Sequence, residues 1–233
     1  MFVVKVLLFG ASGSAGGGVL TACLESAHVA EIRAIVRRPL ARSYQKLRVI
    51  EHHDFENFSA IAGEFAGIDA CMYCLGKSST QVATEEEYRR LTYNYAVAAA
   101  TMLHRESPAA VFHFISGAGT SADSRFMWAR IKAETERALL ASADVVCWRP
   151  AAIDGAPSAS EPLLYRLFRP AYRVLRPLRN LYVSAEDIGL AMIQATAERL
   201  RHRIIENEGI RDLADRARSL EQLAILRRTQ TRS

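Results

Sequence analysis

The N-terminal strand and the turn after it constrain the fold of this chain most strongly. An apolar run rich in β-branched residues, VVKVLLF over 3–9, has the character of a strand buried on both faces. Gly10, Gly13 and Gly16 follow it at G-x-x-G-x-x-G spacing, and an apolar helical pattern begins near Val19. Glycines alone would also fit a flexible loop, but a strand before them and a helix after them predict a dinucleotide-binding turn.

Each glycine has its own physical role in such a turn. Gly10 lets the chain reverse tightly, Gly13 lets the backbone approach a pyrophosphate, and Gly16 lets the helix pack closely on the strand. The N–H groups of the first helical turn and the helix dipole would then face the phosphates.

Length and composition indicate one domain over 1–233 with an ample core, because half of the 233 residues are hydrophobic. No apolar stretch reaches the roughly 20 residues that span a bilayer, and no signal peptide is visible, so we expect a cytoplasmic protein. The formal net charge of +5 comes mostly from scattered arginines. Without a nucleic-acid-binding motif, this charge is typical of a solvated surface, and we expect no nucleic-acid partner.

Cysteine and histidine pairs in the chain suggest metal sites only at first sight. Cys71 and Cys74 form a C-x-x-C inside an apolar strand pattern, which favours buried, reduced thiols. His52 and His53 are adjacent near the end of a strand, so their side chains point to opposite faces. We therefore expect no metal centre.

The rest of the chain alternates between strand and helix patterns. Strands are predicted over 31–36, 47–51, 68–75, 111–115, 145–148 and 204–206, and helices over 58–65, 85–105, 127–142 and 184–201, with a helical tail from 210. This alternation predicts an α/β fold, a Rossmann-type doubly wound parallel sheet with helices on both faces. Ligands of such sheets bind beyond the carboxyl ends of the strands.

The end of the second strand indicates which dinucleotide would bind. An acidic residue there holds the 2′-hydroxyl of NAD, whereas arginine accommodates the 2′-phosphate of NADP. This chain has Arg37 and Arg38 at that position and no acid. Two solvated surface arginines are the alternative, but the register favours NADP(H) as the cofactor.

Several stretches in a fixed order resemble a known family. They are LLFGASGSAGG, IVRRPL, HDFENF, ACMYCLG, FHFISGAG, WARIKAETE, VCWRPAAIDG and IIENEGIRDL. With them the chain resembles an atypical short-chain dehydrogenase/reductase of the Tat-interacting oxidoreductase-like family. The resemblance implies a Rossmann fold, NADP(H) binding and a carbonyl reductase activity.

The resemblance also implies which residues surround the cofactor. The phosphate turn would comprise Gly10, Ser12, Gly13, Ser14, Ala15 and Gly16. Arg37 and Arg38 would bind the 2′-phosphate, and Asp54 and Phe55 would lie beside the adenine. Leu75 and Gly76 would cover the ribose and phosphates. The nicotinamide end would meet Ser116, Lys132 and Pro150.

One position departs from the family's Y-x-x-x-K motif, because Trp128 stands where the tyrosine is expected, four residues before Lys132. The tyrosine would give a proton to the carbonyl, and the lysine would lower its pKa. An indole N–H donates a hydrogen bond but does not release its proton near neutral pH, and a general acid is usually worth about 10²–10⁴-fold in rate. We predict that Ser116, Lys132 and Trp128 form the catalytic group. Catalysis would be impaired or altered because Trp128 replaces the tyrosine. Tyr93 and Tyr95 on the preceding helix are the alternative acids.

The segment 154–180 is rich in proline, arginine and aromatic residues. By position it is predicted to be a substrate-side lid, with a partner face, as in a homodimer, and a membrane-surface segment as alternatives. Three functions fit the sequence: reduction of a small-molecule carbonyl substrate, NADPH-dependent binding of a protein partner without turnover, and sugar-nucleotide epimerisation. The short region after Pro150 argues against the third, because it leaves little room for a nucleotide-sugar domain.

Overall fold

The computed structural model describes residues 3–40, 43–155, 178 and 180–230, and its centre is a seven-stranded sheet in the order β3-β2-β1-β4-β5-β6-β9. Neighbouring strands pair in parallel throughout this sheet. The strands are β1 (Val4–Phe9), β2 (Val29–Val36), β3 (Leu47–Glu51), β4 (Ala70–Tyr73), β5 (Val111–Ile115), β6 (Val145–Arg149) and β9 (Arg203–Glu206). The predicted doubly wound parallel sheet is confirmed.

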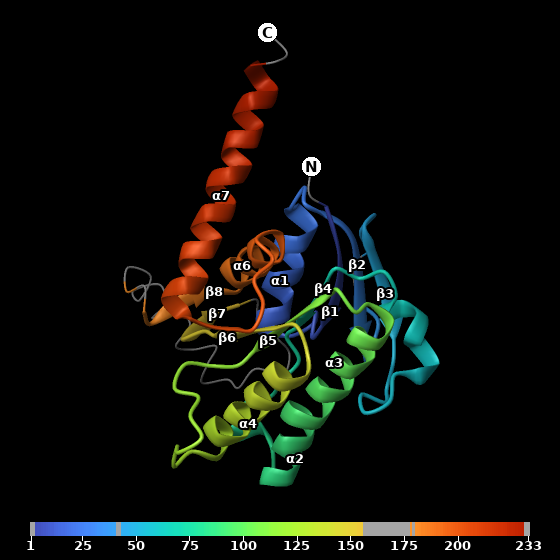
Figure 1. Ribbon diagram of the computed structural model, residues 1–233, viewed down its shortest axis with the longest axis vertical. Coiled ribbons are helices and arrows are strands. Elements are labelled where there is room, and N and C mark those ends of the chain that lie inside the picture. The colour runs from blue at the N-terminus through green and yellow to red at the C-terminus, as the bar shows by residue number, and fades with distance from the viewer. Residues whose placement is uncertain (1–2, 41–42, 156–177, 179, 231–233) are drawn as a thin grey trace.

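Helices cover both faces of the sheet (Figure 1). One face carries α1 (Ser14–Glu25), α6 (Ala185–Ala197) and α7 (Asn207–Gln230), and α7 extends beyond the sheet. The other face carries the 3₁₀ helix η1 (Ser59–Phe65), α3 (Tyr95–Glu106) and α4 (Met127–Ser142). This two-sided cover explains the continuous apolar runs in the strands, because both faces of the sheet are buried.

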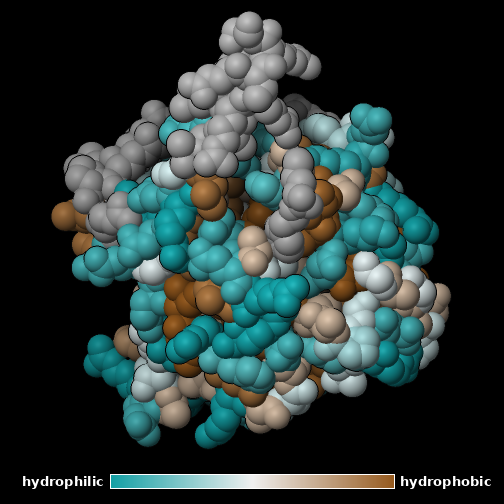
Figure 2. All heavy atoms as spheres, turned by 45° about the horizontal axis from the view of Figure 1, so that its top comes forward, coloured by the Kyte–Doolittle hydropathy of each residue, from teal (hydrophilic) through white to brown (hydrophobic). Residues whose placement is uncertain are grey.

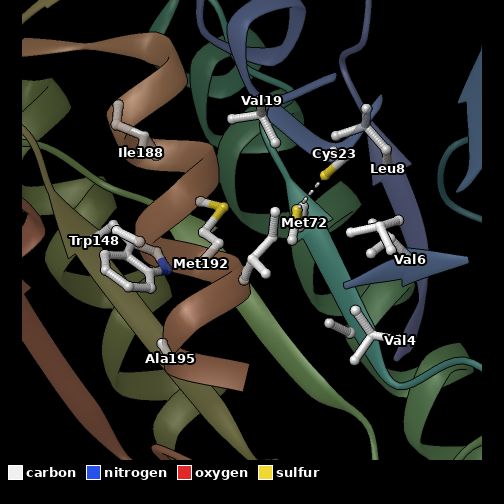
Figure 3. Close-up of a cluster of buried hydrophobic side chains, with 14 of the residues drawn as sticks. Val4, Val6, Leu8, Val19, Cys23, Met72, Trp148, Ile188, Met192 and Ala195 are labelled. Carbon is white, nitrogen blue, oxygen red and sulfur yellow. Dashed lines mark hydrogen bonds between the residues drawn. The ribbon is translucent and has the colours of Figure 1, made fainter. Parts of the chain in front are cut away.

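The first of two hydrophobic clusters lies between the sheet and the helices α1 and α6 (Figure 3). Trp148 of β6 lies near Met192 of α6, and the Cys23 thiol of α1 donates a hydrogen bond to Met72 Sδ of β4 at 3.5 Å. The two helices can approach closely because Gly18 has no side chain. A Cβ at that position would overlap Ala185. This packing holds α1 in place above β1 and β4.

The second cluster lies under η1, α3 and α4 and is largely aromatic. The Phe9 ring is 5.7 Å from the Phe58 ring, in an edge-to-face arrangement, and 5.3 Å from the Tyr73 ring. Such pairs add to the free energy gained by burying their area.

The structure differs from the predicted helices in three places. The helix predicted over 85–105 is divided into α2 (Glu85–Arg89), a π-helical turn η3 (Arg90–Asn94) and α3. The helix predicted to reach residue 201 ends at Ala197, because Arg199 and His202 have left-handed φ angles of 54° and 50° in the turn to β9. Residues Ser59–Phe65 form a 3₁₀ helix.

A two-stranded parallel sheet of β7 (Ala152–Asp154) and β8 (Tyr182–Ser184) was not predicted. The Tyr182 hydroxyl donates to Asp154 Oδ2 at 2.9 Å across it. Most of the predicted lid segment between these strands lies outside the described residues, and its role stays a prediction.

The surface turned forward in Figure 2 is mainly hydrophilic, with hydrophobic residues in small groups. Within the described ranges, no helix is both long enough and apolar enough to cross a membrane. The four cysteines are free, and burial raises the pKa of the Cys23 thiol to about 12.

A buried histidine joins the sheet to α6. His113 of β5 is fully buried, accepts a hydrogen bond from Trp148 Nε1 at 3.2 Å through Nδ1, and has Nε2 2.9 Å from Thr196 Oγ1. Because Nδ1 accepts, Nε2 carries the ring proton and donates a hydrogen bond to the Thr196 hydroxyl. That hydroxyl in turn donates a hydrogen bond to the Met192 carbonyl. The network is complete only with a neutral imidazole, and burial lowers the pKa of His113 to about 3.

We expect acid to destabilise the fold through His113. Its pKa is about 3 when folded and 6.5 as a free side chain, so below 6.5 only the unfolded chain takes up the proton. Between about pH 7.5 and about pH 5.5, this group should lower the free energy of unfolding by about 1.4 kcal/mol. Urea titrations of the protein and of His113→Gln, which cannot titrate there, measure the difference. Equal pH dependence of the two proteins would contradict this account.

Candidate functional site

The glycine turn joins β1 to α1 through close backbone contacts. Gly10 has a left-handed φ of 79°, and a Cβ there would lie 2.6 Å from the Cys74 carbonyl oxygen. The Gly13 N–H donates to the Gly10 carbonyl at 2.8 Å, and a Cβ on Gly16 would overlap that same carbonyl. The helix therefore begins at Ser14, well before the apolar pattern near Val19 that marked it in the sequence.

The start of α1 is open to an acceptor from outside the turn. Its N-cap, Gly13, has no side chain that could accept from the first-turn N–H groups. Among the described residues, a Cβ on Gly13 would have the Gly10 carbonyl oxygen alone within 4 Å, at 3.2 Å. Ser12 is exposed, and Ser14 and Ala15 are half-buried. Such a helix start is suited to phosphate oxygens.

A pocket lies beyond the carboxyl ends of β2, β3 and β4. Its lining residues are Arg37, His53, Phe55, Leu75, Gly76, Lys77, Leu91 and Tyr95. Its volume of about 130 Å³ is below the roughly 300–1,000 Å³ of whole ligand sites. The pocket can therefore hold one end of an extended ligand, with apolar and aromatic walls and a cationic rim.

Four of the predicted cofactor residues meet in this pocket: Arg37, Phe55, Leu75 and Gly76. Two others are not among the residues that line it, and their cofactor roles stay predictions. Arg38 is exposed, as Arg37 is, and follows it directly in the chain. The Asp54 carboxylate accepts the Glu56 N–H at 3.1 Å and caps its own loop.

The sequence did not predict four residues of the pocket wall. His53 and Lys77 lie shortly after the ends of β3 and β4, and this position is the only signal that could have indicated them. Leu91 belongs to the π-helical turn η3 and Tyr95 follows it. A helical pattern of normal period gives no sign of such a turn.

A second group of predicted residues surrounds the loop after β5. Lys132 Nζ, on α4, donates to the Ser116 carbonyl oxygen at 2.5 Å. The Ser116 hydroxyl is buried and lies 3.0 Å from Thr120 Oγ1, which donates to the Gly117 carbonyl at 2.8 Å. The Ala118 N–H donates to the Pro150 carbonyl at 2.9 Å and joins this loop to the end of β6.

The surroundings of Lys132 stabilise its positive charge only weakly. Burial lowers the pKa of its ammonium to about 8, although the Glu136 carboxylate acts to raise it. Both Glu136 oxygens accept from Arg149, at 3.0 and 2.7 Å, and Arg149 also pairs with Glu206 at 3.0 Å. Glu136 therefore mainly neutralises Arg149 and offsets only part of the effect of burial on Lys132.

Trp128 lies beside Lys132, one helical turn earlier on α4. A Cβ on Gly117 would lie 3.6 Å from Lys132 Nζ and 3.8 Å from Trp128 Cζ3, and one on Gly119 would lie 3.8 Å from Trp128 Cη2. The outer edge of the indole's six-membered ring therefore faces the loop after β5. This edge carries only C–H groups, so Trp128 brings no acidic proton to the loop.

The two alternative tyrosines have other surroundings. Tyr95 lines the pocket at the ends of β2–β4. The Tyr93 ring lies 4.3 Å from the Arg89 guanidinium, which pairs with Glu134 of α4 at 2.5 Å. Neither has a described contact with the Ser116–Lys132 group, so the structure does not support moving the acid to either residue. In the part of the chain that is described, no group of three or more His, Cys, Asp or Glu could hold a metal ion.

Comparison with known proteins finds similar architectures. No protein-family model matches the chain. The protein FMP52, mitochondrial, of Candida albicans is 25% identical over 167 residues, which are 69% of this chain and 72% of that protein. The Bordetella bronchiseptica enzyme WbmF in complex with NAD+ has a TM-score of 0.68 at 11% identity, over 94% of this chain and 78% of that one.

A short-chain type dehydrogenase/reductase from Mycobacterium ulcerans has a TM-score of 0.65 at 18% identity, over 90% of each chain. Identities this low carry information about architecture and not about activity. The chain thus has the Rossmann fold that WbmF and this short-chain dehydrogenase/reductase share.

Proposed function

We propose that the chain is an NADP(H)-binding protein of the atypical short-chain dehydrogenase/reductase type, as its resemblance to the Tat-interacting oxidoreductase-like family suggests. The pocket at the ends of β2, β3 and β4 carries this proposal. It lies on the sheet edge that also holds the open glycine turn, where dinucleotides bind in such folds. WbmF, of the same fold, is known in complex with NAD+.

The residues of the pocket fit the adenosine end of the cofactor. Phe55, Leu75 and Tyr95 offer apolar and aromatic surface for adenine, while the cations Arg37 and Lys77 lie at the rim. None of the described residues that line the pocket is acidic, while Glu51 lies 3.2 Å from His53 and Glu87 lies 3.5 Å from Lys77. Arg37 is therefore the lining cation without a described carboxylate partner. This charge distribution favours NADPH over NADH.

The cofactor preference should depend on Arg37. We expect the protein to bind NADPH at least about tenfold more tightly than NADH, a difference of about 1.4 kcal/mol. Arg37→Ala should remove most of this preference, because Arg37 lines the pocket. Arg38→Ala removes the same charge outside the pocket and serves as the matched control. NADPH fluorescence titration measures both, and equal affinities in the unaltered protein would refute the NADP(H) assignment.

The phosphate position can be tested at Gly13. Gly13→Val should fold, because a side chain there meets little of the protein, yet it should abolish cofactor binding by filling the space of the pyrophosphate. Gly63→Val is the control, since a Cβ there has no atom within 4 Å. Circular dichroism verifies folding, and NADPH titration measures binding. Retained binding in folded Gly13→Val would show that the phosphates lie elsewhere.

If the protein is an enzyme, the group around Lys132 determines its rate. A bound NADPH would supply a hydride to a small carbonyl substrate. Lys132 would hold the nicotinamide ribose, while Trp128 would contribute an indole in place of a phenol. The developing alkoxide would find only hydrogen-bond donors and water, and we expect slow turnover.

Replacing Trp128 tests this account of catalysis. Trp128→Tyr would restore a phenol beside Lys132 and should raise NADPH-dependent carbonyl reduction by about 10²-fold, the low end of a general acid's effect. Trp128→Phe introduces the ring of tyrosine without its hydroxyl and should give no increase in the rate of carbonyl reduction. Steady-state rates with a panel of aldehydes and ketones measure the difference. Fast reduction by the unaltered protein, insensitive to Trp128, would contradict this prediction.

A second candidate function is NADPH-dependent binding of a protein partner without turnover. The residue that favours it is again Trp128. The pocket proposed for the cofactor is present, whereas the tyrosine that would donate the proton is replaced by Trp128. Reductase activity absent from both the unaltered protein and Trp128→Tyr, with NADPH binding intact, would support this candidate.

A further inference from the structure

A cluster of three side chains connects the adenine-side loop to the π-helical turn. Glu56 follows Phe55 at the end of the pocket loop, and its Oε2 accepts from Arg90 Nε at 3.0 Å and Arg90 Nη2 at 2.7 Å. Its other oxygen, Oε1, accepts from Asn94 Nδ2 at 3.2 Å. Both oxygens of one carboxylate are therefore occupied by donors from the same turn, η3.

The same turn shapes the pocket wall. The Tyr95 N–H donates to the Arg90 carbonyl, the i→i+5 bond that defines the π-helical turn. Leu91 of this turn and Tyr95 directly after it both line the pocket. The residues that bind Glu56 and the residues that form the wall thus alternate along one short stretch.

Tyr95 is held from two sides. The Arg90 guanidinium lies 5.8 Å from the centre of the Tyr95 ring, and the Phe55 ring lies 5.7 Å away at an angle of 31°. Glu56 keeps Arg90 in that position, and it stays ionised because the hydrogen bonds from Arg90 and Asn94 hold its pKa below the usual value. A change at Glu56 would therefore reach Tyr95 through Arg90.

These contacts contribute little to overall stability. The side chains of Arg90 and Glu56 are 58% and 36% exposed, and ion pairs as exposed as this usually add little to the free energy of unfolding. Their placement around the pocket wall, and not their strength, suggests a role.

We propose that Glu56, Arg90 and Asn94 form a positioning clamp that holds Tyr95 and Leu91 as the wall of the adenosine pocket. The clamp rests on the proposed NADP(H) binding and adds positioning residues to it. It acts on the adenosine moiety common to every adenine nucleotide, so it sets affinity without setting the choice between NADPH and NADH. Arg37, at the rim, is responsible for that choice.

Glu56→Ala tests the clamp by freeing both Arg90 and Asn94. We expect about tenfold weaker binding of NADPH, of NADH and of AMP, with an unchanged NADPH to NADH ratio, because a preorganised wall is lost. Nicotinamide mononucleotide, which has no adenosine, should bind as before. Glu106→Ala removes an ion pair with Arg105 at the far end of α3 and should leave all four affinities unchanged.

A second variant distinguishes loss of the clamp from a general loss of stability. Arg90→Met removes the cation over Tyr95. If Glu56 and Arg90 act as a unit, the double variant should bind NADPH no more weakly than the single variant that has the lower affinity. Thermal melting should be close to that of the unaltered protein for each. An additive double variant, or a loss of binding that includes nicotinamide mononucleotide, would overturn the clamp.

The failure of the clamp and the failure of the proposed function have different signatures. Unaltered affinities in Glu56→Ala, in a protein that binds NADPH, overturn the clamp alone. A shifted NADPH to NADH ratio also overturns it, since Glu56 would then act on the 2′-phosphate. An unaltered protein that binds neither dinucleotide overturns the proposed function and the clamp together.

Discussion

The carboxyl edge of the sheet depends on one close approach of backbone to backbone. The Gly10 carbonyl occupies the space that a side chain on Gly16 would need, and Gly10 itself lies against the Cys74 carbonyl. With no side chains in the way, α1 begins directly beyond the end of β1, and its first turn faces the edge where the pocket opens. The packing of Gly18 against Ala185 then holds α1 on α6 and keeps that direction.

The two halves of the site are built on different strands. The pocket belongs to the ends of β2, β3 and β4, whereas Ser116 and Lys132 belong to β5 and α4. The Arg149–Glu136 pair joins α4 to the end of β6. The pocket and the Ser116–Lys132 group therefore rest on different elements of the fold.

The sequence by itself determined the parts of the structure that depend on local patterns. The strand over 111–115 and the helix over 127–142 were predicted with their observed bounds, because apolar runs and helical periodicity are properties of neighbouring residues. The same patterns predicted the parallel sheet, and the convergence of strand ends brought Arg37, Leu75 and Gly76 to one pocket. The spacing of Trp128 and Lys132 on one helix was also visible, since it is a property of the chain.

Only the tertiary structure decided which neighbours of these residues face the pocket. Arg37 lines it and Arg38 does not, although they are adjacent, identical in chemistry and both exposed, so no local pattern distinguishes them. Leu91 and Tyr95 reach the wall through a π-helical turn that packs against Glu56, a residue distant in the sequence. A helical pattern in the sequence has one period, whereas a π-helical turn locally changes that period. Its position therefore depends on contacts that form only when the chain is folded.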